Sequence, residues 1–418
     1  MKKIVLLSFF ILSLLLTGCW NARELNELGL TLVIGLDLVD DKVLVTAEVV
    51  NPTYSQQSST TTGQGSYVKY VQGVGNNIYE AYRDITLKFD RRLSIVHNRV
   101  FILGEDFAKK GLVSQIDELY RDVEQRETAY LLVAKGGKAY EVMGINSGLE
   151  ELPSNYITKI VENFKYNPKT VDTNLVQYIK QYYKMGHHSI IGTIEKKEKK
   201  VIDQTVEKTG TQDYELSVIG SAIFNEDVLV GYLNGNDTKS VNFVMNKIRG
   251  GIITFPTPTA QVEGSSTPPP PVEGEMPNKQ KDQNLSSVIV IKNNTKNDVE
   301  MVDGNIKLKT KIELRGSLGE VVGNIDVAEK ENIIKLEEAC SKAIEDGIKR
   351  AFKKAQKEYG IDIFGYGLVF HRKYPEEWKR IKKDWDEIFS QADFEIEVNT
   401  DIIRTGLINT PINKIKGK

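Results

Sequence analysis

A proline-rich segment interrupts this chain of 418 residues and sets the boundary between its folded sections. Seven of the twelve prolines lie between Pro256 and Pro277, and four of them are consecutive at 268–271. Proline fixes an extended backbone and lacks the amide proton that a sheet needs, so such a run cannot lie inside a sheet. We therefore expect a linker over residues 256–284, with folded domains before and after it.

The section after the linker, residues 285–410, has the pattern of a two-layer α+β domain. Alternating apolar residues predict an antiparallel meander with strands at 288–291, 299–302 and 306–314. Apolar residues then recur at helical spacing over 331–359, and Gly360 supplies the stop. We expect this long helix to cover the meander and to bury Cys340 as a structural thiol, with a reactive thiol as the alternative.

Strands and amphipathic helices are mixed before the linker, without a regular βαβ repeat. Residues 19–200 are therefore predicted to form an N-terminal α+β domain. Residues 201–255 contain a hairpin that turns at 225–227, followed by a helix with Asp237 as its N-cap. We interpret them as a small middle domain, so the predicted fold class is α+β, with three domains of mixed sheet and helix.

The first 18 residues have the form of an export signal that ends at a cysteine. Two lysines precede an apolar run that spans about 20 Å as a helix, which is too short for the roughly 30 Å core of a bilayer. The run closes with Leu-Thr-Gly-Cys at 16–19, which resembles a bacterial lipobox. We predict removal of the signal peptide 1–18, a diacylglyceryl group on Cys19, and Trp20 at the membrane interface. An ordinary secretory signal with a chance cysteine is the alternative.

Composition and motifs offer no catalytic, metal or nucleic-acid site. The signal contains two of the 55 basic residues and none of the 57 acidic ones, so the mature chain lacks the basic excess that nucleic-acid binding needs. No nucleophile–base motif, CxxC pair or helical histidine pair occurs, so we expect no enzymatic activity, cofactor or metal. Gly73 and Gly75 precede a helix as in a dinucleotide loop, but Ile78 occupies the third small position, which favours a tight strand–helix turn.

Several stretches, in the same order along the chain, resemble the Ger(x)C lipoproteins, which are the C subunits of spore germinant receptors. The mature N-terminus is similar to that family's Gly-Cys-Trp, Arg-Glu-Leu-Asn-Glu-Leu and Gly-x-Asp pattern, here at 18–20, 23–28 and 35–37. Tyr232 stands where tryptophan is common in the family's Gly-x-Ala-x-Phe hairpin. The other matching stretches are DRRLSIVHNRVFILGEDFAKKGL, LYRDVEQRETAYLLVAKGGKAYEVM, GSAIFNEDVLVGYLN and DIFGYGLVFHRKYPEEWKRIKKDWDEIF.

The resemblance implies a three-domain protein without enzymatic activity. It also implies an integral-membrane A subunit and a transporter-like B subunit as partners, in a receptor that senses nutrients and triggers germination. We therefore expect a membrane-anchored lipoprotein on the outer surface of the inner spore membrane. We expect no direct small-molecule ligand, because the family assigns nutrient sensing mainly to the B subunit.

Two other functions remain open at this point. The substrate-binding lipoprotein of an ABC importer would share the anchor, but it should show two βαβ lobes around a cleft. An exported hydrolase would need a nucleophile and a base, which the motifs do not supply.

Three segments are candidate contacts with the A and B subunits, namely residues 23–28, 91–97 and 364–378. Residues 23–28 dock on a partner or, alternatively, start a helix that packs on the body. His97 is either a contact or a hydrogen-bonded structural histidine in a strand, and Trp378 is either a contact or a core residue seven positions before Trp385. The candidate contact residues are Arg23, Glu24, Leu25, Asn26, Arg91, Arg92, His97 and Trp378.

Overall fold

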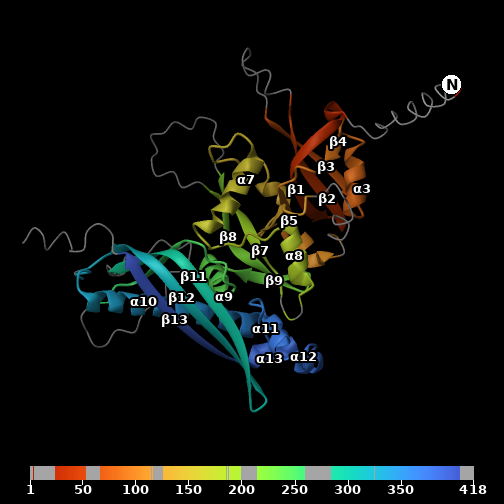
Figure 1. Ribbon diagram of the computed structural model, residues 1–418. Helices are drawn as coiled ribbons and strands as arrows, with labels where there is room; N and C mark the ends of the chain where they lie inside the picture. The colour runs from red at the N-terminus through yellow and green to blue at the C-terminus, as the bar shows by residue number, and fades with distance from the viewer. Residues whose placement is uncertain are drawn as a thin grey trace, which may run out of the picture.

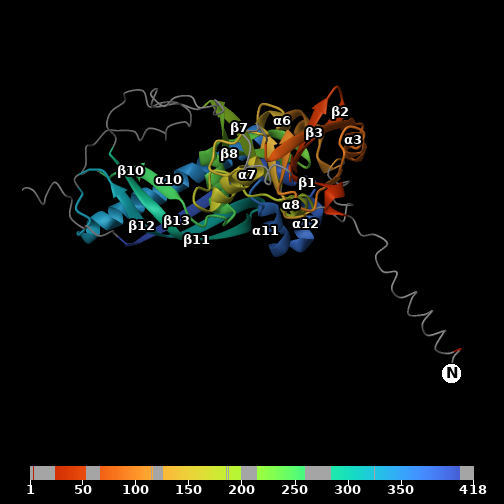
Figure 2. The ribbon, with the colours of Figure 1, turned by 90° about the horizontal axis from the view of Figure 1, so that it is seen from above.

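In a computed structural model of the chain, two lobes lie along one long axis (Figures 1 and 2). One lobe is built on a nine-stranded sheet and the other on a four-stranded sheet. The residues that the structure describes are 3, 24–52, 66–113, 115, 126–184, 186, 188–198, 214–258, 284–323 and 325–404. Among these residues, every helix is too short or too polar to span a bilayer.

The first lobe is a mixed sheet in the order β3-β2-β1-β5-β6-β7-β8-β9, with the short β4 beside the start of β1. Its centre, β1-β5-β6-β7, is parallel, and antiparallel strands extend it on both sides. The strands are β1 (Leu28–Val39), β2 (Lys42–Val50), β3 (Val68–Gly75), β4 (Arg92–Ser94), β5 (Val100–Gly104), β6 (Tyr130–Ala134), β7 (Ile190–Glu198), β8 (Tyr214–Asn225) and β9 (Val228–Leu233).

Helices cover both faces of this sheet, because successive side chains along its apolar strands point to opposite sides. Ile34 and Phe101 pack in the cluster that includes α3, α4 and α8, whereas Val33 and Ile102 pack with α6 and α7. These helices are α3 (Ile78–Ile85), α4 (Glu105–Lys110), α6 (Ala139–Val142), α7 (Pro153–Glu162) and α8 (Leu175–Tyr182), with 3-10 turns η1 (Leu25–Glu27) and η2 (Asn163–Lys165).

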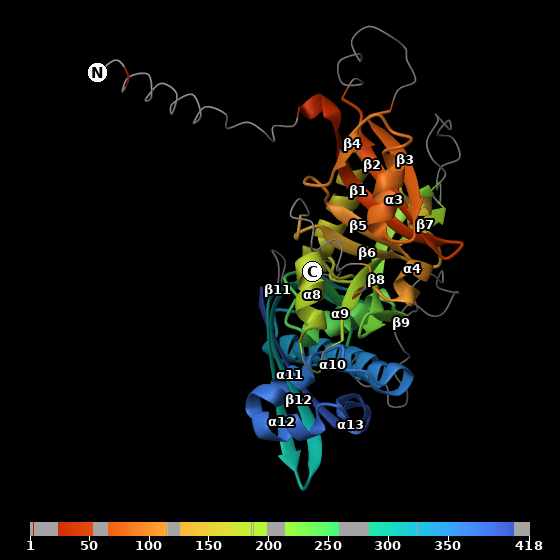
Figure 3. The same cartoon turned by 90° about the vertical axis from the view of Figure 1, so that its right-hand side faces the viewer.

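The second lobe packs one long helix, α10, on a sheet of order β10-β11-β12-β13 (Figure 3). Its strands are β10 (Ile252–Pro256), β11 (Leu285–Val302), β12 (Asn305–Val321) and β13 (Asp393–Arg404). Its helices are α9 (Gly235–Val244), α10 (Lys330–Lys354) with the π-helical turn η3 (Ala355–Tyr359), α11 (Tyr366–Lys373), α12 (Pro375–Ile381) and α13 (Trp385–Gln391).

The long helix and its stop are confirmed. The chain leaves η3 through Gly360, which adopts the left-handed conformation with φ 67°. Cys340 is fully buried on the apolar face of α10, and this burial raises the pKa of its thiol to about 12. The thiol therefore has the environment of a structural residue, as the periodicity predicted.

One apolar core joins the two lobes. Val241 and Val244 of α9 belong to the same buried cluster as Ile190 and Ile223 of the first sheet and Ile348 of α10. Because α9 is shared in this way, the lobes are packed against each other through side chains rather than only connected by the chain.

The predicted α+β class is confirmed, whereas the meander differs in detail. The expected strands at 288–291 and 299–302 are a single strand, β11, because the polar residues between them pair with β12. β13 runs parallel to β12, since the intervening helices carry the chain back along the sheet. The second sheet is therefore mixed rather than wholly antiparallel.

The segment 201–255 is divided between the two lobes by its strand pairing. Its hairpin turns where predicted, with Glu226 at φ 53°, but β8 pairs with β7 and thereby extends the first sheet, while β10 pairs with β11 of the second. The helix α9 has Asn234 and not Asp237 as its N-cap, because the Asn234 side chain accepts from the Asp237 amide at 2.8 Å. Most of the predicted linker, residues 259–283, lies outside the described residues.

The two glycines before α3 confirm the tight strand–helix turn. A Cβ atom on Gly73 would lie 2.1 Å from the Ala81 carbonyl oxygen, and one on Gly75 would lie 2.4 Å from the Ala81 amide nitrogen. Only glycine therefore lets α3 pack this closely against β3, and this steric requirement accounts for both glycines without a nucleotide.

Candidate functional site

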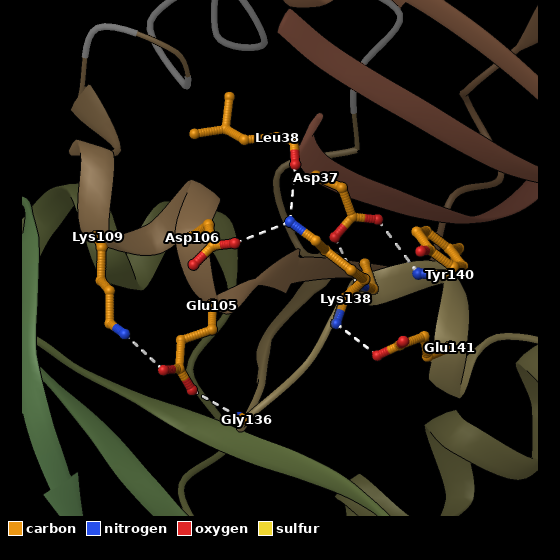
Figure 4. A network of polar contacts seen from close by, with 10 residues as sticks. Asp37, Leu38, Glu105, Asp106, Lys109, Gly136, Lys138, Tyr140 and Glu141 are labelled. Atoms are coloured by element: carbon orange, nitrogen blue, oxygen red, sulfur yellow. Dashed lines mark hydrogen bonds and ion pairs between the residues drawn. The ribbon is translucent and has the colours of Figure 1, made fainter. Parts of the chain in front are cut away.

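A polar network lies where β1, β5 and β6 end, and Asp37 is its buried member (Figure 4). The Asp37 carboxylate accepts from the amides of Ala139, at 2.6 Å, and Tyr140, at 3.2 Å. Burial raises the pKa of this carboxyl to about 6, although the two amides and nearby Lys138 act in the opposite direction. The side chain is fully enclosed, so it fixes the start of α6 rather than facing solvent.

Two glycines make room for this carboxylate and its helix. A Cβ atom on Gly104 would lie 2.0 Å from Asp37 Oδ1, and one on Gly35 would lie 2.6 Å from the Met143 sulfur. The Gly-x-Asp pattern of β1 thus has a steric reason: the glycine admits the end of α6, and the aspartate two residues later holds its beginning.

Lys138 connects this carboxylate to the neighbouring helix. Its ammonium group donates to the Leu38 carbonyl and to Asp106, both at 2.8 Å. The bond to Asp106 raises the pKa of Lys138, so the amine stays charged at neutral pH. The loop before α6 is therefore attached both to β1 and to α4.

Glu105, the next member, accepts three hydrogen bonds. They come from the Gly136 amide and Lys109, both at 2.6 Å, and from the Tyr232 hydroxyl at 2.7 Å. Burial alone would raise the pKa of Glu105, but the three donors outweigh it and lower the pKa. Tyr232 belongs to β9, so this carboxylate links α4 to the edge of the first sheet.

Tyr359 extends the chain of contacts into the second lobe. Its hydroxyl accepts from the Tyr232 amide at 3.2 Å and donates to the Tyr232 carbonyl at 3.0 Å. A Cβ atom on Gly231 would lie 2.2 Å from the Tyr359 ring, so the absence of a side chain there lets the ring reach the strand. The η3 turn of the second lobe is thereby bonded to β9 of the first.

His188 forms a second junction between the lobes. Its Nε2 lies 2.9 Å from Asp386 of α13, and its Nδ1 accepts from the Glu226 amide at 3.2 Å. An amide donor at Nδ1 requires that nitrogen to be unprotonated, so the proton resides on Nε2 and is donated to Asp386. The imidazole thus joins β7, the β8–β9 turn and α13.

Asp362 organises the helices on the far side of this junction. Its fully buried carboxylate accepts from the amides of Phe364, Gly365 and Gly367 and from the Trp385 indole. Burial raises its pKa to about 6 against these four donors. The aspartate of the Asp-x-Phe-Gly stretch therefore fixes the turn that follows it through backbone amides, and it fixes α13 through the Trp385 indole.

These polar arrangements join separate parts of the fold. Asp37, Glu105 and Asp362 are each held by amide or side-chain donors. In the described part of the chain, no cluster of histidine, cysteine or acidic residues could hold a metal ion. Among these polar arrangements, the hydrogen bonds of Tyr359 with Tyr232 and of His188 with Asp386 connect the two lobes.

The structure brings two of the predicted contact segments together. Leu28 at the start of β1 pairs in register with Arg92 of β4, so the two segments meet where residues 28–30 run parallel to residues 92–94. Glu24, Asn26, Arg92 and His97 are exposed there, and Arg91 is half-buried. The Asn26 side chain donates to Glu24 at 3.1 Å, and Leu25 begins the short turn η1. Cys19, Trp20 and Arg23 lie outside the described residues.

The structure distinguishes between the alternatives that the sequence leaves open for His97 and Trp378. His97 lies in an exposed turn between β4 and β5, so it is not the structural histidine of a strand. Trp378 is 2% exposed and packs edge-on against Trp385, with ring centroids 5.4 Å apart. Its side chain therefore belongs to the core and presents no surface to a partner, because α12 folds back over α11 and α13.

Sequence reasoning missed the residues that join the lobes, namely Glu105, His188, Tyr232, Tyr359 and Asp386. The available signal was local: Gly104 ends an apolar strand directly before Glu105, and Gly35 stands two residues before Asp37 within another. The partners of those acids lie up to 127 residues away along the chain, as for Glu105 and Tyr232, and no local pattern identifies them.

Comparison with known proteins gives matches along nearly the whole chain. Residues 21–196 match the family model described as "Spore germination protein N-terminal domain", and residues 219–406 match "Spore germination B3/ GerAC like, C-terminal". The chain is 28% identical to spore germination protein KC of Bacillus subtilis, covering 98% of both chains. It is 25% identical to spore germination protein B3 of the same organism, covering 96% of this chain and 97% of that one.

A solved structure has the same fold. The crystal structure of the GerBC protein superposes with a TM-score of 0.51 at 20% identity, over 89% of this chain and 97% of that one. The shared fold and the two adjoining family models define a spore germination protein. Within that class, the chain belongs to the Ger(x)C family.

Proposed function

We propose that this chain is the lipid-anchored C subunit of a nutrient germinant receptor. It would act in spore germination through assembly and signalling with an integral-membrane A subunit and a transporter-like B subunit. The observation that carries the proposal is the coverage: spore germination protein KC matches over 98% of both chains, so the resemblance extends to the whole architecture rather than to one shared module.

The lipid anchor at Cys19 would set the position of the first lobe. Eight residues lie between Cys19 and Leu28, and an extended chain covers at most about 30 Å over the nine residue steps from one to the other. The end of the sheet where β1 meets β4 therefore lies within about 30 Å of the anchor. Two acyl chains on Cys19 would hold this end stably at the outer surface of the inner spore membrane, with Trp20 at the interface.

The exposed polar residues at this end are the proposed contact with the A and B subunits. Glu24, Asn26, Arg92 and His97 are exposed, and the segments that carry them meet where Leu28 of β1 pairs with Arg92 of β4. Tethering raises the effective concentration of the lobe at its partners, so weak polar contacts at this edge suffice. We propose a binding and signalling role without a catalytic step and without a directly bound nutrient.

The importer alternative has less support from the fold. It calls for two βαβ lobes, whereas the second lobe is a mixed sheet covered by one long helix. Calorimetric titration of the protein with amino acids and sugars separates the two functions. The receptor proposal expects no saturable micromolar binding, and the importer function requires it.

Cys19→Ala tests the proposal in spores. We expect the variant to fold normally, to leave the membrane fraction and to lose the germination response to the nutrients that its receptor serves. Gene deletion, scored nutrient by nutrient, identifies those nutrients and should give the same loss. A variant that leaves the membrane yet germinates normally would refute the anchored-subunit function.

A further inference from the structure

Side chains of α10 cover most of the free edge of β13 in a regular series. β13 is the last strand of its sheet, so every second amide points away from β12. The amides of Val398, Thr400 and Ile402 donate to three acceptors on successive turns of α10, which are Glu345, Ser341 and Glu337. Helix and strand thus run alongside each other with one contact per helical turn.

This series stops before the beginning of the strand. The next two positions on the same face of α10 are Lys349 and Lys353, which carry donors and cannot accept from an amide. By the same alternation, the amides of Ile396 and Phe394 point to this edge, beyond the last acceptor of the series on α10. At this end of the strand α10 therefore carries donors at the positions where the series would need acceptors.

The surface of the second lobe has a depression next to these lysines. An open depression of about 350 Å³ lies between the end of α10, the end of α13 and the start of β13. Its floor contains Phe352 and Phe394, whose rings stack with centroids 3.8 Å apart. Its lining residues are Lys349, Phe352, Lys353, Gln356, Lys357, Ser390, Gln391, Ala392, Asp393 and Phe394.

The charge of the depression is positive. Lys349, Lys353 and Lys357 are exposed at its rim, and Asp393 is the one acidic residue among those that line it. Lys349 lies 3.4 Å from Glu345, and Lys357 donates to the Ser390 carbonyl at 3.0 Å. Lys353 has neither a hydrogen-bond nor an ion-pair partner in the described chain, so its charge is available.

The exposed charges of the neighbouring helices α12 and α13 are mixed, and they include Glu376, Asp384 and Glu387. Trp378 of α12 packs on Trp385 of α13, so the two helices lie side by side at this end of the lobe. In and just after α12, Arg380, Lys382 and Lys383 are exposed. The lysines that complement an acidic group are those at the rim of the depression, and the open hollow suits a side chain that a partner presents.

We propose that this end of the second lobe docks an acidic segment of a partner protein, with one carboxylate in the depression between Lys353 and the amide of Phe394. The carboxylate supplies the acceptor that the series on α10 lacks, and the stacked rings of Phe352 and Phe394 receive the methylene groups of a glutamate side chain. The contact is independent of the lipid anchor, because all of its residues lie in the second lobe.

Binding of a fluorescent peptide to the full-length protein tests this docking surface. The probe is a labelled peptide of alternating glutamate and valine, and its matched control carries glutamine in place of glutamate. We expect saturable binding of the glutamate peptide and at least about tenfold weaker binding to Lys353→Glu. Lys335→Glu, which makes the same charge change at an exposed position near the start of α10, should leave the affinity unchanged.

Hydrogen exchange supplies the local readout. The glutamate peptide should slow amide exchange over residues 392–397 in the parent protein and in Lys335→Glu, but not in Lys353→Glu. Equal binding of the glutamine peptide, equal loss in both variants, or no binding at millimolar peptide would overturn the proposal. Binding only to vesicles of phosphatidylglycerol would also overturn it, because it would assign the surface to lipid instead of protein.

Discussion

The Tyr359 hydroxyl is bonded to both backbone groups of Tyr232, at 3.2 Å from its nitrogen and 3.0 Å from its oxygen. Tyr232 lies in β9, the outermost strand of the first sheet, so one side chain of the second lobe completes a sheet edge as a neighbouring strand would. The Tyr232 side chain in turn reaches Glu105, and the three residues connect α4 to the end of α10.

Removing the Tyr359 hydroxyl should loosen the junction between the lobes. Tyr359→Phe keeps the ring on Gly231 but leaves the Tyr232 amide and carbonyl without this partner, which should lower the free energy of unfolding by about 1–2 kcal/mol. Denaturant unfolding measures the loss. Tyr183→Phe is the matched control, because Tyr183 is 75% exposed and its hydroxyl removal should change little. Equal unfolding free energies of the two variants would contradict a stabilising role of the Tyr359 hydroxyl between the lobes.

Gly104 and Asp37 should show strong energetic coupling. The methyl group of Gly104→Ala, in its ideal position, would lie 2.0 Å from Asp37 Oδ1. The carboxylate must then move, which should lower the free energy of unfolding by about 2–3 kcal/mol. Gly104 has φ −61°, which alanine adopts freely, so the same change should cost far less in an Asp37→Ala background. A double-mutant cycle of unfolding free energies measures this coupling, and simple additivity would argue against the steric relationship.

The buried Asp37 carboxyl should make stability depend on pH. Its pKa is raised to about 6, above the value near 4 expected for the unfolded chain, so the folded state binds the proton more tightly. Its favourable contribution is therefore complete below about pH 4 and is lost as the pH rises through 6, by about 2–3 kcal/mol in total.

Comparison with Asp37→Asn isolates this effect from the surface ion pairs. The difference in unfolding free energy between parent and variant should change between pH 4 and 7, with the parent losing stability relative to asparagine as the pH rises. A constant difference across this range would mean that Asp37 titrates normally.

The elements that the sequence predicted well are those with uninterrupted periodicity. The spacing of Leu336, Cys340, Ile344 and Ile348 defines α10 without help from the rest of the chain. β11 was divided wrongly because its central residues, 292–298, are polar and have low strand propensity. Pairing with β12 overrides that propensity, and a local pattern does not contain this information.

The polar junctions could not be predicted for a related reason. Aspartate is mostly exposed in proteins, so its type does not predict burial, and only the tertiary fold places Ala139 and Tyr140 over Asp37. His188 and Asp386 are 198 residues apart, so neither residue indicates the other. For Trp378 the spacing to Trp385 was visible, but helical spacing alone does not separate a core face from a contact face.

The mass of the mature N-terminal peptide, measured on protein extracted from spore membranes, tests the central claim most directly. We expect a chain that begins at Cys19 and carries a diacylglyceryl group on its sulfur, recovered with the inner membrane. A mature chain without acyl groups at Cys19, or one recovered from the soluble fraction of spores, would contradict the lipid-anchored receptor subunit.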